Sequence, residues 1–539
     1  MSTIDPETRD PNPEARPSRR GLLAAGLVAA LAALVLGLAV LPHAPLPDWD
    51  EATYAFSGKY LRDALAHGHP RKFFDYTKYE MEKPFLHSWM LVPAYALFPA
   101  TPNTARGLSL ACYAACATLL FRLVRRVAPR RGRAAPAVAV AFFLASPIVM
   151  QYALLAMLEL PGTFFTLATL LVFLRAREKG TLALHAWVGV LLAATFLLKY
   201  NYGVVLVLAF AAELAVEARR KEVGLRPVLA LAAPFAASVV LWFSDPYPEK
   251  LRAFLAFTVN RANVDTLLSW PSLAAYPLAL VREYHFLGAL AALTAAGLVG
   301  MAVRSRTERG PRTLLLAFGI NLALVTLHPY KLDRNLIPVA PVLFAAAGIA
   351  IDAAARRAGR AGGRAIVGVL LVLATLAFVG QTARMAGEAR ARVDPFRAEA
   401  LAAVIEPLDR TKRNLVLGEF NELSPDLIHF YAFRQKGREF PLDVGCRVPD
   451  AVFDRRGVVR EFRPSICESV AREIAGSRPD VLVYVDVPPG SPYWPDDYET
   501  WNAWKRHIPA CLAARADFRE VATREFGPGV MTVRVYKKQ

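Results

Sequence analysis

The sequence predicts a polytopic α-helical membrane protein with about eleven transmembrane helices, followed by a soluble α/β domain. The composition supports this fold class, because 55% of the 539 residues are hydrophobic and only 20% are charged. Soluble globular chains usually carry about a quarter charged residues. The apolar residues also collect in long runs before residue 385. A helical run of about 20 apolar residues is long enough to cross the ~30 Å hydrocarbon core of a bilayer.

The first apolar run, Gly21–Leu41, is uninterrupted and follows a charged, proline-containing segment. It is long for the hydrophobic part of a signal peptide and further spans follow, so we expect an uncleaved first span. Residues 1–20 are expected to form a disordered cytoplasmic tail. The remaining spans are expected at residues 104–124, 135–152, 160–175, 182–198, 202–217, 227–243, 285–303, 313–328, 335–353 and 365–384.

The formal charge of +18 would suggest a nucleic-acid partner in a soluble protein. Here Lys and Arg collect in short loops between alternate spans, with six Arg in residues 122–133 alone. This is the pattern of cytoplasmic loops, so it argues against nucleic acid and predicts a cytoplasmic N-terminus. The long loops 42–103 and 244–284 and the terminal domain are then extracytoplasmic. The alternation requires that residues 85–99 do not cross, and we expect them to lie in the interface or to re-enter.

Residues 21–384 are therefore predicted to form the transmembrane module and residues 390–539 an extracytoplasmic α/β domain. Runs of β-forming residues predict strands near 414–418, 480–486 and 530–536, with a helix near 423–433. Three of the five cysteines lie in this domain, where one pair could form a disulfide. We favour Cys446–Cys467, which leaves Cys511 over; Cys112 and Cys116 are expected to pack or to face lipid.

The first long loop carries the densest group of ionisable residues. Asp48, Asp50 and Glu51 lie a few residues beyond the first span, ahead of a predicted helix over 51–66. A solvated helix start would also favour acids at this position. Further along, Glu82-Lys83-Pro84 places an acid and a base before an amphipathic aromatic stretch.

Other ionisable residues lie at span ends on the same predicted outer face, namely Glu159, Lys199, Lys331 and Arg334. A lone basic residue at such a position usually extends to the lipid headgroups. Carboxylates and cations that converge on one face indicate function instead, because charge at membrane depth is costly. A lipid phosphate requires cations, and a hydroxyl nucleophile requires a carboxylate base.

These residues resemble the motifs of the GT-C superfamily of membrane glycosyltransferases, with the protein O-mannosyltransferases and the lipid A aminoarabinose transferase as nearer relatives. The resemblance covers residues ~20–385. It depends on six features in order, which are Asp50-Glu51, Glu82-Lys83-Pro84, Arg106 at the second span, Glu159 at the fourth, Lys199 after the fifth, and Lys331-Leu-Asp-Arg334-Asn335 before a late span. Two positions depart from the pattern, since relatives usually have Asp at 159 and Tyr at 335.

The resemblance implies an inverting transfer of a sugar from a polyprenyl-phosphate donor. Asp50, in its pair with Glu51, would be the first candidate base and Glu159 the second. The cations that would bind the donor phosphate are Lys83, Arg106, Lys199, Arg261, Lys331 and Arg334. Some relatives bind a divalent metal, for which Glu82 with His87 or His285 would be the ligands here. The acceptor would be a glycan, a lipid or a protein, and the location the inner membrane of a bacterium.

Two other readings stay open from the sequence. The first is a multi-span transporter or flippase of a lipid-linked or envelope component, since charges within spans also mark transport paths. Against it, the ionisable residues collect at one face and no inverted repeat is evident. The second is a GT-C-like protein that has lost catalysis, which the departures at Glu159 and Asn335 would allow.

Overall fold

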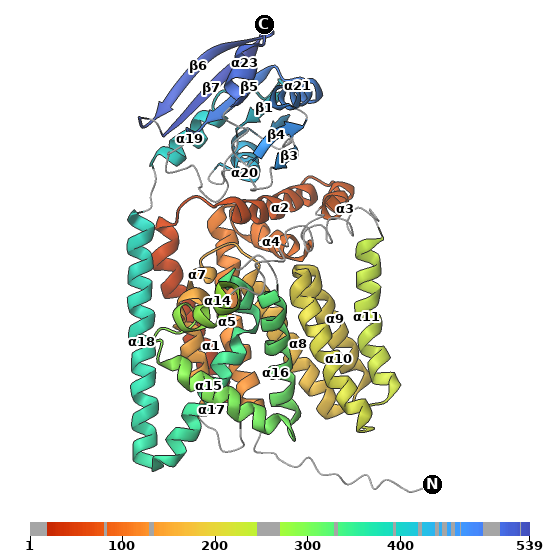
Figure 1. Ribbon diagram of the computed structural model, residues 1–539, viewed down its shortest axis with the longest axis vertical. Helices are drawn as coiled ribbons and strands as arrows, with labels where there is room; N and C mark the ends of the chain where they lie inside the picture. Colours follow the sequence, from red (N-terminus) through yellow and green to blue (C-terminus); the bar gives the residue numbers. More distant parts are fainter. Residues whose placement is uncertain are drawn as a thin grey trace. The chain divides into compact units, whose positions relative to one another are not determined.

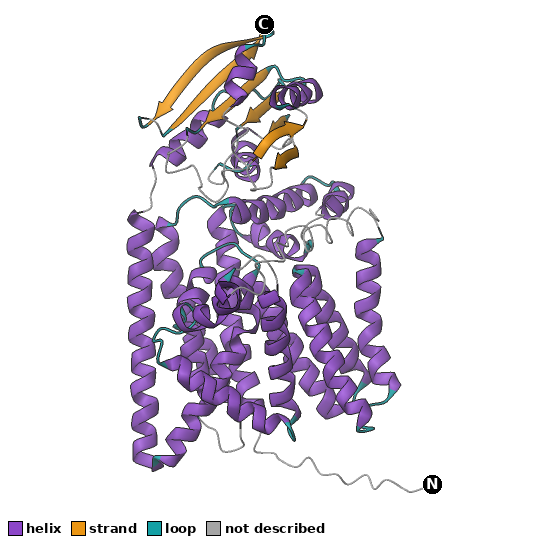
Figure 2. Cartoon of the chain, in the orientation of Figure 1, coloured by secondary structure: helices purple, strands orange, loops and turns teal. Residues whose placement is uncertain are grey.

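The computed structural model divides the chain into two compact units. The first contains residues 1–42, 68–99 and 103–388, and the second contains residues 43–67, 100–102 and 389–539. The structure describes residues 19–79, 84–128, 134–244, 270–327, 332–391, 395–418, 423–436, 441–444, 450–453, 459–463, 465–488, 507–528 and 530–539. In this part of the chain the first unit is helical, and the strands belong to the second unit (Figure 2).

In the described part of the chain, eight helices are long and apolar enough to cross a membrane. They are α1 (Arg19–Val40, continued by η2, Leu41–His43), α5 (Pro102–Val127), α8 (Glu159–Lys179), α10 (Tyr200–Arg219), α11 (Leu225–Phe243), α16 (Arg309–Leu327), α17 (Ala340–Arg357, preceded by η3, Asp333–Val339) and α18 (Gly359–Ala391). A ninth span would be the pair α6 (Ala135–Leu144) and α7 (Pro147–Ala153), which is bent by 62°. Pro147 explains the break, because proline lacks the backbone N–H that would continue the helix.

All eleven predicted spans coincide with helices of the structure. Two of them, α9 (Leu182–Leu198) and α15 (Leu290–Ser305), are apolar but have only 17 and 16 residues. The predicted span 285–303 starts too early, since α15 begins at Leu290. The polytopic helical fold is confirmed, and the count of eleven crossings stays a prediction.

Among the described residues before residue 395, four further helices lie outside the predicted spans. They are α2 (Trp49–Ala66), α3 (Pro70–Tyr79), α4 (Leu86–Leu97) and α14 (Trp270–Arg282). The predicted helix over 51–66 is confirmed by α2. Helix α4 contains Pro93 and has 12 residues, which span about 18 Å. It is therefore too short to cross a ~30 Å core by itself.

Small residues allow close packing between the apolar helices. A Cβ at Gly297 of α15 would clash with the backbone oxygen of Ala346 in α17, and one at Gly189 of α9 would clash with that of Leu231 in α11. Helices in a membrane gain much of their association energy from such contacts. In Figure 1, α9, α10 and α11 accordingly run side by side.

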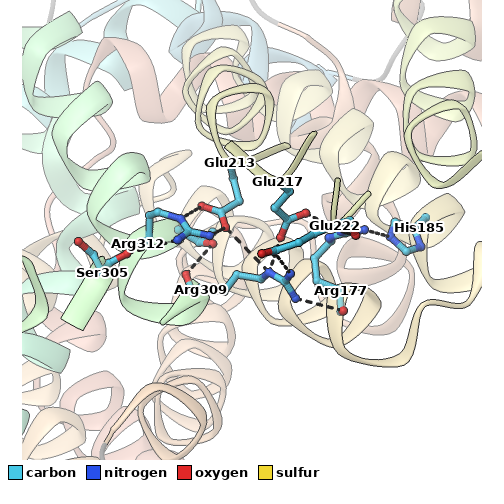
Figure 3. A network of polar contacts seen from close by, with 9 residues as sticks. Arg177, His185, Glu213, Glu217, Glu222, Ser305, Arg309 and Arg312 are labelled. Carbon is cyan, nitrogen blue, oxygen red and sulfur yellow. Dashed lines mark hydrogen bonds and ion pairs between the residues drawn. The ribbon is translucent and has the colours of Figure 1, made fainter. Parts of the chain in front are cut away.

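A network of buried charges joins α8, α9, α10 and α16 (Figure 3). Glu213 and Glu217 of α10 are both fully buried. Arg312 of α16 donates to both oxygens of Glu213, at 2.8 and 2.6 Å. Glu217 pairs with Arg177 of α8 at 2.5 Å and also with Arg309 of α16. Each buried carboxylate is thus matched by arginine.

The network is completed by Glu222 and His185. Arg309 pairs with Glu222 at 3.4 Å, and Arg177 contacts Nε2 of His185 in α9 at 3.1 Å. Three arginines face three glutamates, so the formal charges cancel. Arg177 lies 18 residues after Glu159 in α8, which corresponds to about 27 Å along the helix axis. The network therefore holds the helices together at the end opposite to Glu159.

The second unit contains a five-stranded sheet of order β2-β1-β5-β7-β6 and a two-stranded sheet β3-β4. Strands β2, β1 and β5 are parallel, and β7 and β6 continue the sheet antiparallel. The strands are β1 (Asn414–Leu417), β2 (Leu442–Val444), β3 (Asp450–Phe453), β4 (Val459–Arg463), β5 (Val481–Asp486), β6 (Phe518–Phe526) and β7 (Met531–Lys538). The predicted α/β domain and its three predicted strands are confirmed.

Alternate residues of β5 enter two apolar cores on opposite faces of the sheet. Val483 packs with α19 (Pro395–Ile405) and α20 (Pro425–Lys436), and Tyr484 packs with α21 (Ile466–Ser477) and α23 (Ile508–Ala513). This explains why the sequence of β5 is a nearly continuous apolar run, because both faces of this central strand are covered.

A disulfide joins Cys467 of α21 to Cys511 of α23, with a Cα–Cα distance of 5.1 Å. The predicted pair Cys446–Cys467 is therefore wrong, and Cys446 lies outside the described residues. The two helices cover the same face of the sheet, which brings together cysteines 44 residues apart. Cys112 and Cys116 are both buried in the first unit.

Candidate functional site

Glu159 is the centre of a charged cluster in the first unit. Its side chain opens α8 and is only 1% exposed. Lys199 places its Nζ atom 3.3 Å from Glu159 Oε1, and Arg334 places its Nε atom 3.8 Å from the same oxygen. Three of the residues predicted from the sequence therefore come together, although they belong to three different segments.

Tyr202 is a fourth member that the sequence analysis missed. Its hydroxyl lies 3.3 Å from Lys199 Nζ and 3.5 Å from Glu159 Oε1. The ring passes over Gly162, where a Cβ would clash with it. Its spacing of three residues from Lys199, at the start of a helix, was the available signal. The Tyr202 hydroxyl, the Lys199 ammonium and the Glu159 carboxylate therefore lie within 3.5 Å of one another.

The position of Lys199 follows from a break between two helices. Lys199 ends α9 and precedes α10, and its backbone is extended, with φ −157° and ψ 122°. Its carbonyl accepts a hydrogen bond from the backbone N–H of Tyr202 at 3.1 Å. The residue is thus not inside a continuous helix, and its ammonium reaches back to the start of α8.

The position of Arg334 depends on the short helix η3 and on the hydroxyls that hold it. Tyr284 donates to the carbonyl of Asp333 at 2.6 Å, and Tyr276 donates to that of Leu332 at 3.3 Å. Asn321 of α16 donates to the carbonyl of Asn335 at 3.2 Å. These contacts satisfy carbonyl groups that an irregular segment would otherwise leave open. The segment is therefore anchored on both sides of Arg334.

Among the residues that the structure describes, the cluster contains two cations, Lys199 and Arg334, and one carboxylate. Both cations are partly exposed, at 26% and 21%, while Glu159 is buried. Within the described residues, Glu159 Oε2 is buried and has no hydrogen-bond partner. The cluster can therefore attract an anion through its cations and can accept one more hydrogen bond at Glu159.

An aromatic group lies next to Lys199. Trp242 of α11 donates from Nε1 to the Tyr200 hydroxyl at 2.7 Å, and Phe196 and Phe85 pack against it. The rings of Phe85 and Trp242 are 5.1 Å apart. Phe85 comes two residues after Lys83, so the chain that follows the predicted Lys-Pro motif packs beside the residues that flank Lys199.

Several predicted residues are not placed by the structure or lie elsewhere in it. Glu82, Lys83, Arg261 and Lys331 are outside the described residues. Arg106 lies in the first turns of α5, where it is 2% exposed and donates to Asn103 Oδ1 at 3.3 Å.

Asp50 and Glu51 belong to the second compact unit, together with the terminal domain. They occupy the first turn of α2, where acids interact favourably with the helix dipole. Glu51 is 2% exposed, while Asp50 is half-buried. The preceding acid, Asp48, keeps solvent contact. Desolvation and the charges of Glu51 and Asp50 nevertheless raise its pKa, and the Arg397 guanidinium acts in the opposite direction.

The described residues contain no group of three or more His, Cys, Asp or Glu side chains that could hold a metal ion. His285 is engaged through both ring nitrogens, with the carbonyl of Leu280 at 2.6 Å and the hydroxyl of Thr294 at 2.8 Å. It therefore does not fit the predicted ligand role. His87 is buried in α4, and its predicted partner Glu82 is not described.

Comparison with known proteins supports the fold. Residues 82–243 match the family model of dolichyl-phosphate-mannose-protein mannosyltransferases. The structure is similar to that of ArnT from Cupriavidus metallidurans bound to undecaprenyl phosphate, with a TM-score of 0.62 and 16% identity over 96% of this chain and 98% of that chain. It is also similar to the archaeal oligosaccharyltransferase AglB from Archaeoglobus fulgidus in complex with an inhibitory peptide and a dolichol-phosphate. The TM-score is 0.55, at 13% identity over 96% of this chain and 74% of that chain. No curated protein matches by sequence.

These similarities confirm the GT-C fold that the sequence motifs resembled. The chain is a polytopic membrane protein with this fold and a terminal α/β domain. The match to the family model includes Glu159 and Lys199, while Asp50, Arg334 and the terminal domain lie beyond it.

Proposed function

We propose that this protein is a glycosyltransferase that moves a sugar from a polyprenyl-phosphate donor to an acceptor on the outer face of the membrane. The observation that carries the proposal is the cluster around Glu159, in which two partly exposed cations converge on one buried carboxylate among the described residues. A phosphate monoanion or dianion is the natural ligand of such a pair of cations beside a bilayer. The solved structures of ArnT with undecaprenyl phosphate and of AglB with dolichol-phosphate support this donor class.

Lys199 and Arg334 are the proposed binding groups of the donor phosphate. Their attraction to a phosphate is stronger at a partly desolvated site than in water, because the effective dielectric constant is lower. In the transition state, negative charge builds up on the oxygen that leaves the sugar. Cations held in place beside that oxygen stabilise the transition state more than the ground state. Lys83, Arg106, Arg261 and Lys331 are proposed to assist from the same side of the membrane.

A carboxylate is the proposed base. Asp50, paired with Glu51 in the first turn of α2, is the first candidate, and Glu159 is the second. Oε1 of Glu159 is occupied by both cations and by Tyr202, so Oε2 would be the atom that accepts a proton. The arrangement supports Glu159 mainly as the anchor of the two cations, which leaves the role of base to Asp50.

The proposed reaction is a single displacement at the anomeric carbon. The acceptor oxygen attacks from the face opposite to the phosphate, and its proton passes to the carboxylate. The bond between the anomeric carbon and the phosphate oxygen breaks, and that oxygen keeps the electron pair. The products are an inverted glycoside and a polyprenyl phosphate, which stays in the bilayer. The acceptor would be a glycan, a lipid or a protein.

The topology of the proposal follows from the basic loops. The N-terminus would be cytoplasmic, and the terminal domain would lie outside the inner membrane of a bacterium. The proposed catalytic and phosphate-binding residues would then be accessible from the outer side of the membrane, where envelope acceptors occur. Attachment of a reporter after residue 400 tests this orientation directly, since a signal from inside the cytoplasm would contradict it.

The proposal is tested by transfer from radiolabelled polyprenyl-phosphate sugars to membrane acceptors, with purified protein in proteoliposomes. The wild type should transfer label, and Asp50→Asn should lower kcat by roughly a hundredfold or more, as loss of a general base does. Equal activity of Asp50→Asn would contradict the assignment of the base. A wild type that transfers no sugar from any such donor, while it moves a bound solute across the bilayer, would favour a transporter.

A further inference from the structure

The segment that carries the candidate base is attached to the terminal domain of the chain. Arg397 of α19 donates from Nη1 to the carbonyl of Leu46 at 2.9 Å and from Nη2 to the carbonyl of Pro47 at 2.7 Å. Both carbonyls belong to the same compact unit as Arg397, and Arg397 is largely buried, at 9% exposure. One side chain thus holds two consecutive peptide groups that are 350 residues away in the sequence.

The two peptide groups lie immediately before the acidic segment. Asp48 follows Pro47 directly, and its carbonyl accepts the first helical hydrogen bond of α2, from the N–H of Ala52, at 2.8 Å. Because the guanidinium is planar, its two hydrogen bonds restrict both the distance and the orientation of the chain at this point. Arg397 thus holds the chain directly before the first turn of α2, which carries Asp50.

Further contacts fix α2 in the same domain. Ala52 is buried in the core formed by α19, α20 and the sheet. Thr53 donates to Asp426 of α20 at 2.6 Å, and the ring of Phe56 stacks on His429 of α20, with the ring centroids 5.5 Å apart. Helix α2 is thus held along its length by α20, while Arg397 holds the residues that lead into it.

We infer that the terminal domain positions the candidate catalytic carboxylate, and that Arg397 is the positioning residue. The inference deepens the proposed function and rests on it, because it assigns to the domain a part in the same transfer reaction. Arg397 would act through the geometry of the chain and through its charge near Asp48, without contact with the sugar donor. A displacement of about 1 Å at a reacting group can cost about a hundredfold in rate.

The test compares Arg397→Ala and Arg397→Lys with a matched control. Arg410 is a suitable control, because it is exposed in the same domain and also donates to a backbone carbonyl, that of Gln435 at 2.8 Å. Arg397→Ala should lower kcat by roughly ten- to a hundredfold, with KM for the donor nearly unchanged. Arg397→Lys should lose less, since one ammonium can hold one of the two carbonyls. Arg410→Ala should behave as the wild type.

A double-mutant cycle with Asp50→Asn separates positioning from a general structural effect. If Arg397 acts through Asp50, then Arg397→Ala should cause no further loss in the Asp50→Asn background. The same loss in both backgrounds would overturn the inference, as would an unchanged kcat in Arg397→Ala.

Hydrogen exchange provides a readout that does not depend on activity. Arg397→Ala should increase exchange of the backbone amides in residues 48–56 by roughly tenfold or more, while the amides of β5 keep their protection. Equal acceleration of exchange in β5 would show that Arg397→Ala destabilises the whole domain. Unchanged exchange in residues 48–56 would show that Arg397 does not hold this segment. Either result overturns the inference. A wild type without transfer activity would overturn the proposed function, and the exchange comparison would still decide whether Arg397 holds the segment.

Discussion

The ammonium of Lys199 lies 3.3 Å from the buried carboxylate of Glu159, although 40 residues separate the two in the sequence. Glu159 is the first residue of α8, and Lys199 occupies the break between α9 and α10. The pair joins two helix ends in the membrane unit, with Arg334 on the same oxygen. The lysine keeps 26% exposure, so its ammonium is only partly shielded by the protein.

Loss of either member of this pair should abolish most of the transfer activity. Lys199→Met should lower kcat/KM for the donor by roughly a hundredfold, which is the usual cost of one charge-stabilising group. Glu159→Gln should show a similar defect, because Lys199 and Arg334 lose their common anchor. The two substitutions should not be additive. Transfer from radiolabelled donor in proteoliposomes measures these effects.

The exposed end of α8 provides matched controls for this prediction. Glu178→Gln and Lys179→Met make the same two chemical changes at exposed side chains in the last turn of α8. Both should retain activity within about twofold. Normal turnover in Lys199→Met would show that the cluster does not handle the phosphate.

The hydroxyl of Tyr202 should contribute through orientation of the pair. Tyr202→Phe removes the contacts at 3.3 and 3.5 Å but keeps the ring that packs over Gly162. One hydrogen bond to a charged group is worth about 1.5–3 kcal/mol, so kcat/KM should fall roughly ten- to a hundredfold. The melting temperature should fall by a few degrees at most, no further than in the control. Tyr113→Phe is the control, since it removes a buried hydroxyl that donates to Leu144, and here stability should fall while turnover is kept.

The sequence predicted Glu159, Lys199 and Arg334 because charge at a span end is visible against an apolar background. It did not predict Tyr202, because tyrosines are common at membrane interfaces and the spacing of three residues from Lys199 is a weak signal. The packing of its ring over Gly162 became visible only in the structure. The α/β domain and its strands were also predictable, because both faces of β5 are covered and its residues are almost all apolar.

Long-range contacts between the ends of the chain had no signal in the sequence. Arg397 looks like an exposed residue of an amphipathic helix, and nothing marks the carbonyls of Leu46 and Pro47 as its partners. The disulfide was mispredicted for a related reason, because α21 and α23 meet on one face of the sheet while their spacing in the sequence does not show it.

The buried charges at the opposite end of α8 should contribute to stability and not to chemistry. Glu213→Gln removes the buried carboxylate that accepts two hydrogen bonds from Arg312 (Figure 3). Removal of one member of a buried pair typically costs about 3–5 kcal/mol. The thermal midpoint in detergent should therefore fall by several degrees, while KM for the donor stays unchanged. The exposed pair Arg126–Glu178 is the control, and its loss should cost about 0–1 kcal/mol. Equal midpoints for the two variants would contradict this reading.

Acid should loosen the contact between α2 and α20, because His429 resists protonation there. Burial lowers the pKa of His429 below its ordinary value of about 6.5, against smaller opposite effects from Asp426 and Asp443. As the pH falls below about 6.5, the unfolded imidazole takes up a proton and the packed one does not. The stabilising free energy is thus fully present above that pH and is lost progressively below it.

Hydrogen exchange of the amides in α2 between pH 7 and pH 5 measures this effect, once the intrinsic pH dependence of exchange is removed. The wild type should lose protection over this window. His429→Phe should not, because it keeps ring contacts with Phe56 and Phe433 but cannot be protonated. His507→Phe, an exposed histidine of the same unit, should leave the wild-type pH dependence intact. If His429→Phe loses protection as the wild type does, the imidazole is not the group whose protonation opens the contact.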